Sequence, residues 1–186
     1  MNKTYSYRFN LSKKADIWIS TVLYTLIAIA IIGTLLAVVR PRIDEMRDHY
    51  LIEQTINAMN KIDETVTAVK SAQGTTLSVS FQLSRGTLLV DPAKKIIEWR
   101  IPDSRYQYSE AGFPVDFGNI KVQTDKSYDR WNVSLKLNYS DLTISLDNKS
   151  ESKIFQPSSA PYMIWIKNQG SDGAVLPKLK VDFTID

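Results

Sequence analysis

The sequence predicts an α+β protein, with a long N-terminal helix followed by an antiparallel β-domain that forms a sandwich or a partly closed barrel. Three observations carry this prediction. Residues 17–39 are an unbroken apolar run without a charge. The residues after it keep an apolar stripe at steps of three and four, which is the helical period. From residue 75 onward apolar residues alternate with polar ones, which is the period of a strand with one wet face.

The apolar run is long enough to cross a membrane. As a helix rising about 1.5 Å per residue it reaches roughly 35 Å, slightly more than the ~30 Å hydrocarbon core of a bilayer. A buried core helix rarely needs so many consecutive apolar residues, and a cleaved secretory signal has a shorter apolar stretch. We therefore expect a transmembrane helix over residues 16–40.

Residues 41–73 are expected to form an amphipathic stalk helix. Pro41 lacks a backbone donor and crowds the carbonyl of Ala37, so it should kink or restart the helix near the membrane surface. The apolar stripe comprises Ile43, Met46, Tyr50, Ile56, Met59, Ile62, Val66 and Val69. This stripe can pack against the chain's own β-domain or against neighbouring copies, and one helix can do both.

Residues 74–186 are expected to form the antiparallel β head domain, which is long enough to have its own core. Residues 162–166 are apolar on both faces and are expected to form a central strand. Short connections such as residues 139–141 favour hairpins, and residues 102–118 are expected to be a long loop. Five other segments alternate, starting at Leu77, Ile97, Trp131, Leu142 and Leu179.

The charge distribution argues against nucleic acid as a partner. The chain has 23 Lys and Arg residues, but four of them lie in residues 1–15, which contain no acid. The other 19 basic residues stand against 20 acidic ones and form no basic stripe for phosphate contacts. These four basic residues are Lys3, Arg8, Lys13 and Lys14.

No catalytic residue, cofactor or metal site is expected, and the sequence does not predict an enzyme. There is no cysteine and one histidine, His49, so the usual zinc ligand sets cannot be assembled. No glycine-rich phosphate loop follows a strand. His49 lies among charged neighbours on the stalk helix and is interpreted as a solvated surface residue.

The junction between the leader and the apolar run indicates processing. Lys13 and Lys14 resist burial, so they fix the register of the apolar run at the membrane surface. Ala15, just before Asp16, is small enough to enter a protease cleft. Once residues 1–15 are removed, the helix can exchange lipid for other helices without exposing backbone polar groups.

This arrangement of a basic residue, a small residue, Asp and Ile, placed directly before a long apolar helix, resembles the class III signal of archaeal type IV pilin-like proteins. The layout of a protruding N-terminal helix and a β-rich head resembles that family over the whole chain. The resemblance implies that a prepilin peptidase in the membrane cuts between Ala15 and Asp16. The fifth mature position is Ser20; many bacterial pilins carry a glutamate there, and many archaeal members lack it.

Three sequons in the predicted β-domain are candidate N-glycosylation sites: Asn132-Val-Ser, Asn138-Tyr-Ser and Asn148-Lys-Ser. Asn132 and Asn138 share the polar parity of their strand, so both should face water. Basic residues flank the apolar run on both sides, so charge counting does not set the orientation. The sequons favour a β-domain outside the cell.

We therefore expect a pilin-like structural subunit of a type IV pilus-like surface filament. The helix would anchor the chain in the cell membrane as a single pass and would enter the filament core after processing. The extracellular β-domain would form the outer surface and serve adhesion. The expected partners are the membrane, the prepilin peptidase, and copies of the chain itself or related pilin subunits. The alternative is a monomeric surface receptor or binding protein held by an uncleaved signal anchor.

Overall fold

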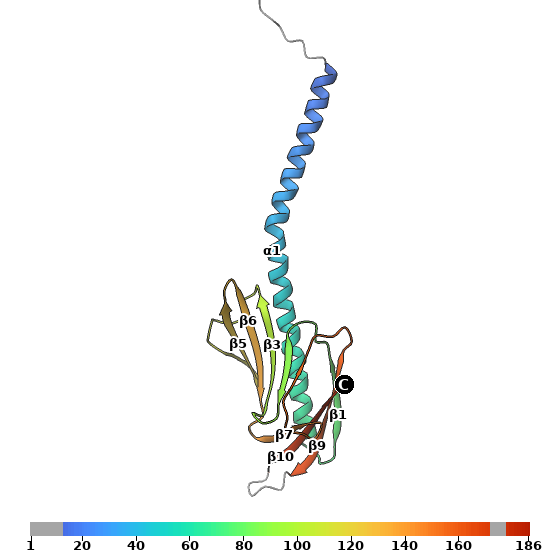
Figure 1. Cartoon of the computed structure of the whole chain (residues 1–186), viewed down its shortest axis with the longest axis vertical. Helices are drawn as coiled ribbons and strands as arrows, with labels where there is room; N and C mark the ends of the chain where they lie inside the picture. The colour runs from blue at the N-terminus through green and yellow to red at the C-terminus, as the bar shows by residue number, and fades with distance from the viewer. Residues whose placement is uncertain (1–12, 172–177) are drawn as a thin grey trace, which may run out of the picture. The chain divides into compact units, whose positions relative to one another are not determined.

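The computed structural model describes residues 13–171 and 178–186, with side chains from residue 18 onward (Figure 1). The chain divides into two compact units, Met1–Asp44 and Glu45–Asp186, and the helix α1 (Lys13–Val69) contributes to both. The strands are β1 (Thr76–Phe81), β2 (Thr87–Asp91), β3 (Ile96–Ser104), β4 (Val115–Phe117), β5 (Ile120–Ser127), β6 (Arg130–Asn138), β7 (Leu142–Leu146), β8 (Lys153–Phe155), β9 (Tyr162–Ser171) and β10 (Leu179–Ile185).

In the first unit, α1 presents an apolar surface. Every side chain from residue 18 to residue 39 is exposed. Within the described residues, α1 is the one helix long and apolar enough to cross a membrane. The hydroxyls of Thr25 and Thr34 donate to the carbonyls of Thr21 and Ala30 at 2.7 and 2.9 Å. These polar groups are therefore satisfied within the helix, as in other helices of this kind.

Pro41 lies inside α1, because the helix is continuous on both sides of it. The helix therefore does not restart at the proline, and the expected kink stays a prediction. The boundary between the two compact units follows Asp44, a few residues further along the helix.

In the second unit, one face of α1 enters the core of the β-domain. The buried apolar residues of this face are Ile52, Ile56, Met59, Ile62, Val66 and Val69. Met46 and Tyr50 are 72% and 68% exposed. The predicted stripe therefore divides in two, since its members from Ile56 onward pack against the chain's own β-domain and the earlier ones do not.

The β-domain is a sandwich-like arrangement of two open sheets, which confirms the predicted α+β class and excludes a closed barrel. The four-stranded sheet has the order β1-β9-β10-β7, and the six-stranded sheet has the order β4-β5-β6-β3-β2-β8. Both sheets contribute to the core that receives α1, for example through Trp99 of β3 and Phe183 of β10. All pairings are antiparallel except that of β7 with β10, which is parallel.

The hairpin predicted at residues 139–141 is wrong, because β6 and β7 belong to different sheets. Tyr139 explains the difference. Its backbone N–H donates to the carbonyl of Lys95 at 2.9 Å, and its ring is buried 6.4 Å from the ring of Phe183, measured between centroids. The chain therefore leaves the six-stranded sheet at this residue and starts β7 in the four-stranded sheet.

The other strand predictions agree with the structure. The five alternating segments are strands, and residues 162–166 begin β9, an inner strand of its sheet. The predicted loop at residues 102–118 is shorter, because β3 extends to Ser104 and β4 occupies part of the rest. His49 is half-buried and packs against the rings of Tyr106 and Tyr108, with centroids 4.4 and 6.2 Å away, so it is not a freely solvated side chain.

Candidate functional site

The leader-peptidase residues Lys13, Lys14, Ala15 and Asp16 are the first residues of α1. Their side chains lie outside the described part of the chain, as do residues 1–12. Processing between Ala15 and Asp16 therefore stays a prediction.

The three sequon asparagines all lie exposed in the β-domain, but the structure does not bring them together. Asn132 and Asn138 are exposed on β6, as their parity predicts. Asn148 lies in the turn after β7, with a positive φ of 60°. Its backbone N–H donates to Asp182 at 2.8 Å, and its side-chain oxygen accepts from Gln169. Glycosylation of these residues stays a prediction.

The exposed apolar part of α1 is the first candidate site. Fourteen large apolar side chains between Trp18 and Val39 are exposed. Burying each of them would contribute about 1.5 kcal/mol or more, so this surface strongly favours an apolar environment. An exposed apolar surface of this size marks a site of membrane or protein interaction.

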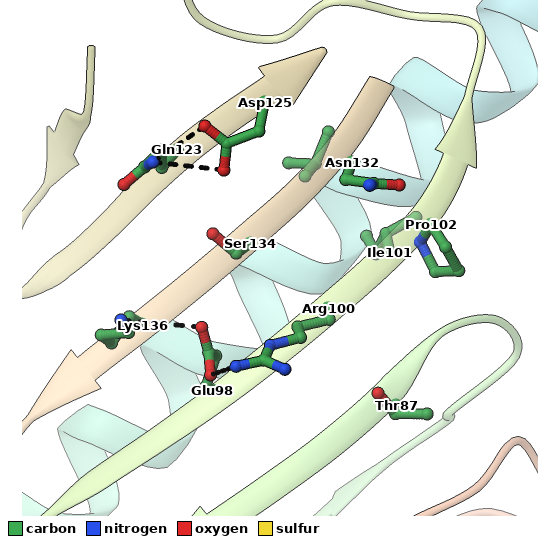
Figure 2. Close-up of a pocket in the computed structure, with 11 residues that line it drawn as sticks. Thr87, Glu98, Arg100, Ile101, Pro102, Gln123, Asp125, Asn132, Ser134 and Lys136 are labelled. Atoms are coloured by element: carbon green, nitrogen blue, oxygen red, sulfur yellow. Dashed lines mark hydrogen bonds and ion pairs between the residues drawn. The ribbon is translucent and has the colours of Figure 1, made fainter. Parts of the chain in front are cut away.

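The second candidate site is a polar basin on the outward face of the six-stranded sheet, with a cavity volume of about 500 Å³ (Figure 2). "The basin" denotes the cavity lined by Thr87, Glu98, Arg100, Ile101, Pro102, Gln123, Asp125, Asn132, Val133, Ser134 and Lys136. These residues come from four neighbouring strands, β5, β6, β3 and β2.

The strand register explains the hollow. Ser134 pairs with Gln123 on one side and with Arg100 on the other, and Arg100 pairs with Thr87. The short side chain of Ser134 lies between the longer Gln123 and Arg100, and the short Thr87 ends the row beyond Arg100 (Figure 2). Gly86, with a φ of 85°, precedes Thr87, and a Cβ there would lie 2.1 Å from the Arg100 carbonyl oxygen. Glycine therefore permits β2 to approach β3 beside the basin.

Charges in the basin are balanced. The buried carboxylate of Glu98 accepts from Arg100 Nη2 at 2.6 Å and lies 3.6 Å from Lys136 Nζ. The Gln123 amide donates to both carboxylate oxygens of Asp125, at 2.9 and 3.2 Å. Both cations thus contact Glu98, whereas Asp125 accepts from an amide, and the basin holds two positive and two negative side chains.

The basin was not predicted from the sequence. The alternation in residues 130–138 places Asn132, Ser134 and Lys136 on one face, which is the signal that was available. Their meeting with Arg100 and Gln123 depends on β6 lying between β5 and β3. Among the described residues, no group of three or more His, Asp or Glu side chains is placed to hold a metal ion.

Fold and site together define a protein with one candidate membrane-spanning helix, within the described residues, and a sandwich-like β-domain. A long N-terminal apolar helix followed by a β-domain fits the layout of type IV pilin-like proteins. Comparison of the chain with protein-family models, with curated proteins and with solved structures gives no match.

Proposed function

We propose that this chain is a pilin-like structural subunit of a type IV pilus-like surface filament of the archaeal kind. The observation that supports the proposal is the complete exposure of residues 18–39 in a chain whose β-domain has its own core. This segment contributes no residue to that core. Its apolar side chains are therefore available for lipid or for neighbouring helices.

In this proposal the helix lies first in lipid and later among neighbouring helices. Residues 1–15 act as a class III leader and hold the helix in the cell membrane until a prepilin peptidase cuts between Ala15 and Asp16. The helix, whose backbone groups are bonded internally, then exchanges lipid for the helices of sister or related subunits. The β-domain stays outside the cell and serves a structural and adhesive role without catalysis.

The basin favours a second candidate function. A monomeric chain with an uncleaved anchor would display the basin on an extracellular β-domain and act as a surface receptor or binding protein. The two functions differ in the fate of the leader and in whether the chain leaves the membrane.

Mass spectrometry of the native N-terminus separates the two functions. We expect the chain in a sheared filament fraction to begin at Asp16. Ala15→Phe should block the cut because a large ring does not fit a cleft that takes a small residue, and the uncut chain should stay in the membrane. Ala15→Ser is the matched control and should be processed normally. A chain that retains Met1 and never enters the filament fraction would establish the receptor instead.

A further inference from the structure

We infer that the basin binds a neutral saccharide, held by hydrogen bonds from the outward face of the six-stranded sheet. Its volume of about 500 Å³ lies within the range of small-molecule pockets, roughly 300–1,000 Å³. This space accommodates one or two sugar rings. The site lies outside the apolar helix on which the proposed function depends.

The spacing of the polar groups suits a sugar. Gln123, Ser134, Arg100 and Thr87 occupy one row across four adjacent strands (Figure 2). Neighbouring strands lie about 4.8 Å apart, which is comparable to the width of a pyranose ring. Amides and hydroxyls both donate and accept, so Gln123 of β5, Ser134 of β6 and Thr87 of β2 can match a sugar hydroxyl in either sense. Arg100 of β3 adds N–H groups that only donate.

The charge balance favours a neutral ligand. Glu98 and Asp125 would repel a phosphate or carboxylate, and Arg100 and Lys136 would repel a metal cation. An apolar ligand would leave these polar groups without partners, at a cost in binding free energy. A neutral molecule with many hydroxyl groups avoids both the charge repulsion and the loss of hydrogen-bond partners.

The pair of Glu98 and Arg100 also orders the site. Glu98 is buried and accepts from one guanidinium nitrogen at 2.6 Å, which restricts the otherwise exposed Arg100 side chain. The remaining guanidinium N–H groups are available to donate to sugar oxygens. A preordered donor loses less conformational freedom when the ligand binds.

None of the eleven lining residues is aromatic, so recognition depends on hydrogen bonds without ring stacking. We therefore expect weak binding at a single site, on the order of millimolar. Repetition of the site along a filament would raise the overall affinity through multivalency. This last step rests on the proposed function, whereas binding to one chain does not.

The saccharide has two conceivable sources. Asn132 and Ser134, the first and third residues of one sequon, both line the basin. A glycan attached to Asn132 would therefore start inside it. The other source is a saccharide from outside the chain, such as one on a surface to be adhered to.

The test titrates the full chain, produced without N-glycosylation and held in lipid nanodiscs, with maltotriose, chitotriose and mannotriose. We expect saturable binding of at least one of them, measured by saturation-transfer NMR. Gln123→Ala removes an amide, and Thr87→Arg fills the hollow without touching the sequon; each should weaken binding about tenfold or more. Lys121→Ala, on the same face of β5 but outside the basin, is the matched control and should bind normally.

Absence of binding by all three sugars would overturn the inference, as would tighter binding of inorganic phosphate. Equal weakening by Lys121→Ala would place the binding elsewhere and would also overturn it. Comparing the natively glycosylated chain with Asn132→Gln identifies the source: a site that opens only in Asn132→Gln holds the chain's own glycan, and a site open in both takes a saccharide from outside. Binding with normal strength in a chain that never forms filaments would refute the proposed function alone.

Discussion

Asp48 is a buried carboxylate on α1, 7% exposed, whose two oxygens are both hydrogen-bonded. Oδ1 accepts from Arg85 Nη1 at 2.5 Å, and Oδ2 accepts from the backbone N–H of Arg105 at 2.7 Å. Arg85 Nη2 also donates to the carbonyls of Pro102 and Asp103, at 2.8 and 2.6 Å. A single acid therefore joins the helix to the segment before β2 and to the end of β3.

Replacing this acid should destabilise the β-domain. We expect Asp48→Ala to lower the free energy of unfolding by about 2 kcal/mol, less than the ~3–5 kcal/mol of a fully buried pair. The reduction reflects the Arg85 side chain, which is 34% exposed and can be rehydrated. Urea unfolding in detergent micelles, followed by tryptophan fluorescence, measures the change. The exposed Glu53→Ala is the control, with an expected change below about 0.5 kcal/mol; equal effects of the two variants would contradict this role of Asp48.

Tyr139 is a buried residue of a different kind. Its hydroxyl has no hydrogen-bond partner among the described residues, while the nearby Asp63 accepts from Asn119 at 2.7 Å. Burial raises the pKa of the Tyr139 hydroxyl far above its ordinary value, and the carboxylates of Asp63 and Asp141 raise the pKa further. The folded chain therefore keeps this proton at a pH at which the unfolded chain releases it.

This difference in pKa predicts an alkaline loss of stability. The contribution of Tyr139 is fully present below a pH of about 10, the ordinary tyrosine pKa, and falls by about 1.4 kcal/mol per pH unit above it. Tyr139→Phe should remove this loss. At neutral pH it should be about as stable as the parent, because the deleted hydroxyl lies beside the Asp63 carboxylate without a well-formed hydrogen bond. Urea unfolding at pH of about 7 and about 11 tests both points. Tyr128→Phe, at a fully exposed tyrosine, is the control; a parent-like loss in Tyr139→Phe would refute the assignment.

At the scale of elements, α1 combines two surfaces with different requirements. Residues 18–39 are exposed and apolar, and the face from Ile52 to Val69 is buried in the core. A single helix thus serves both as a candidate membrane span and as a core element of the β-domain. A substitution in the first part should leave the fold of the second intact, because the β-domain core and the apolar residues packed against it contain no residue before Leu51.

Ile29→Lys tests the first surface. Ile29 lies near the middle of the exposed apolar segment, and a lysine at mid-membrane costs about 3 kcal/mol. We expect this variant to be lost from the membrane fraction, measured by quantitative immunoblotting after fractionation. Ile29→Leu, which preserves apolar character, is the control and should fractionate like the parent. Normal membrane retention of Ile29→Lys would show that the segment does not span a bilayer.

The helix and most of the longer strands could be predicted because their apolar residues recur with the helical or the strand period. The predicted stripe failed at one point: it steps from Tyr50 to Ile56, and a step of six residues turns a helix by about 240°. That step moves the stripe to another face, which explains why Tyr50 is exposed. β5 was missed although Ile120 and Val122 alternate, because its third inward residue is the polar Thr124. The Thr124 hydroxyl is buried and accepts from the Ser109 N–H at 3.0 Å. Alternation of apolar and polar residues cannot predict a polar side chain that is buried in this way.

At the scale of the whole molecule, the order of the strands in the six-stranded sheet determines which side chains meet, and this order could not be predicted from the sequence. Sequence parity placed Asn132 and Asn138 outward, but only the order of the six-stranded sheet brings Asn132 together with Arg100 and Gln123. β2, β4, β5 and β8 were absent from the prediction, and β4 and β8 are only three residues long. Short edge strands of this kind gain their structure from the neighbour to which they bond, so their own residues carry little signal.

The position of β10 in the sheet determines when the β-domain can complete its fold during synthesis. β10 follows all the other strands in the chain, yet it occupies an interior position between β9 and β7, and it supplies the parallel partner of β7. The four-stranded sheet is thus interrupted until residues 179–185 have left the ribosome. The ribosome makes α1 long before these residues, so α1 would be free to enter a bilayer before the sheet is complete. In the membrane-anchored chain that we propose, insertion would precede completion of the head, and a nascent chain stalled before β10 would be tethered with its hydrophobic interior still open.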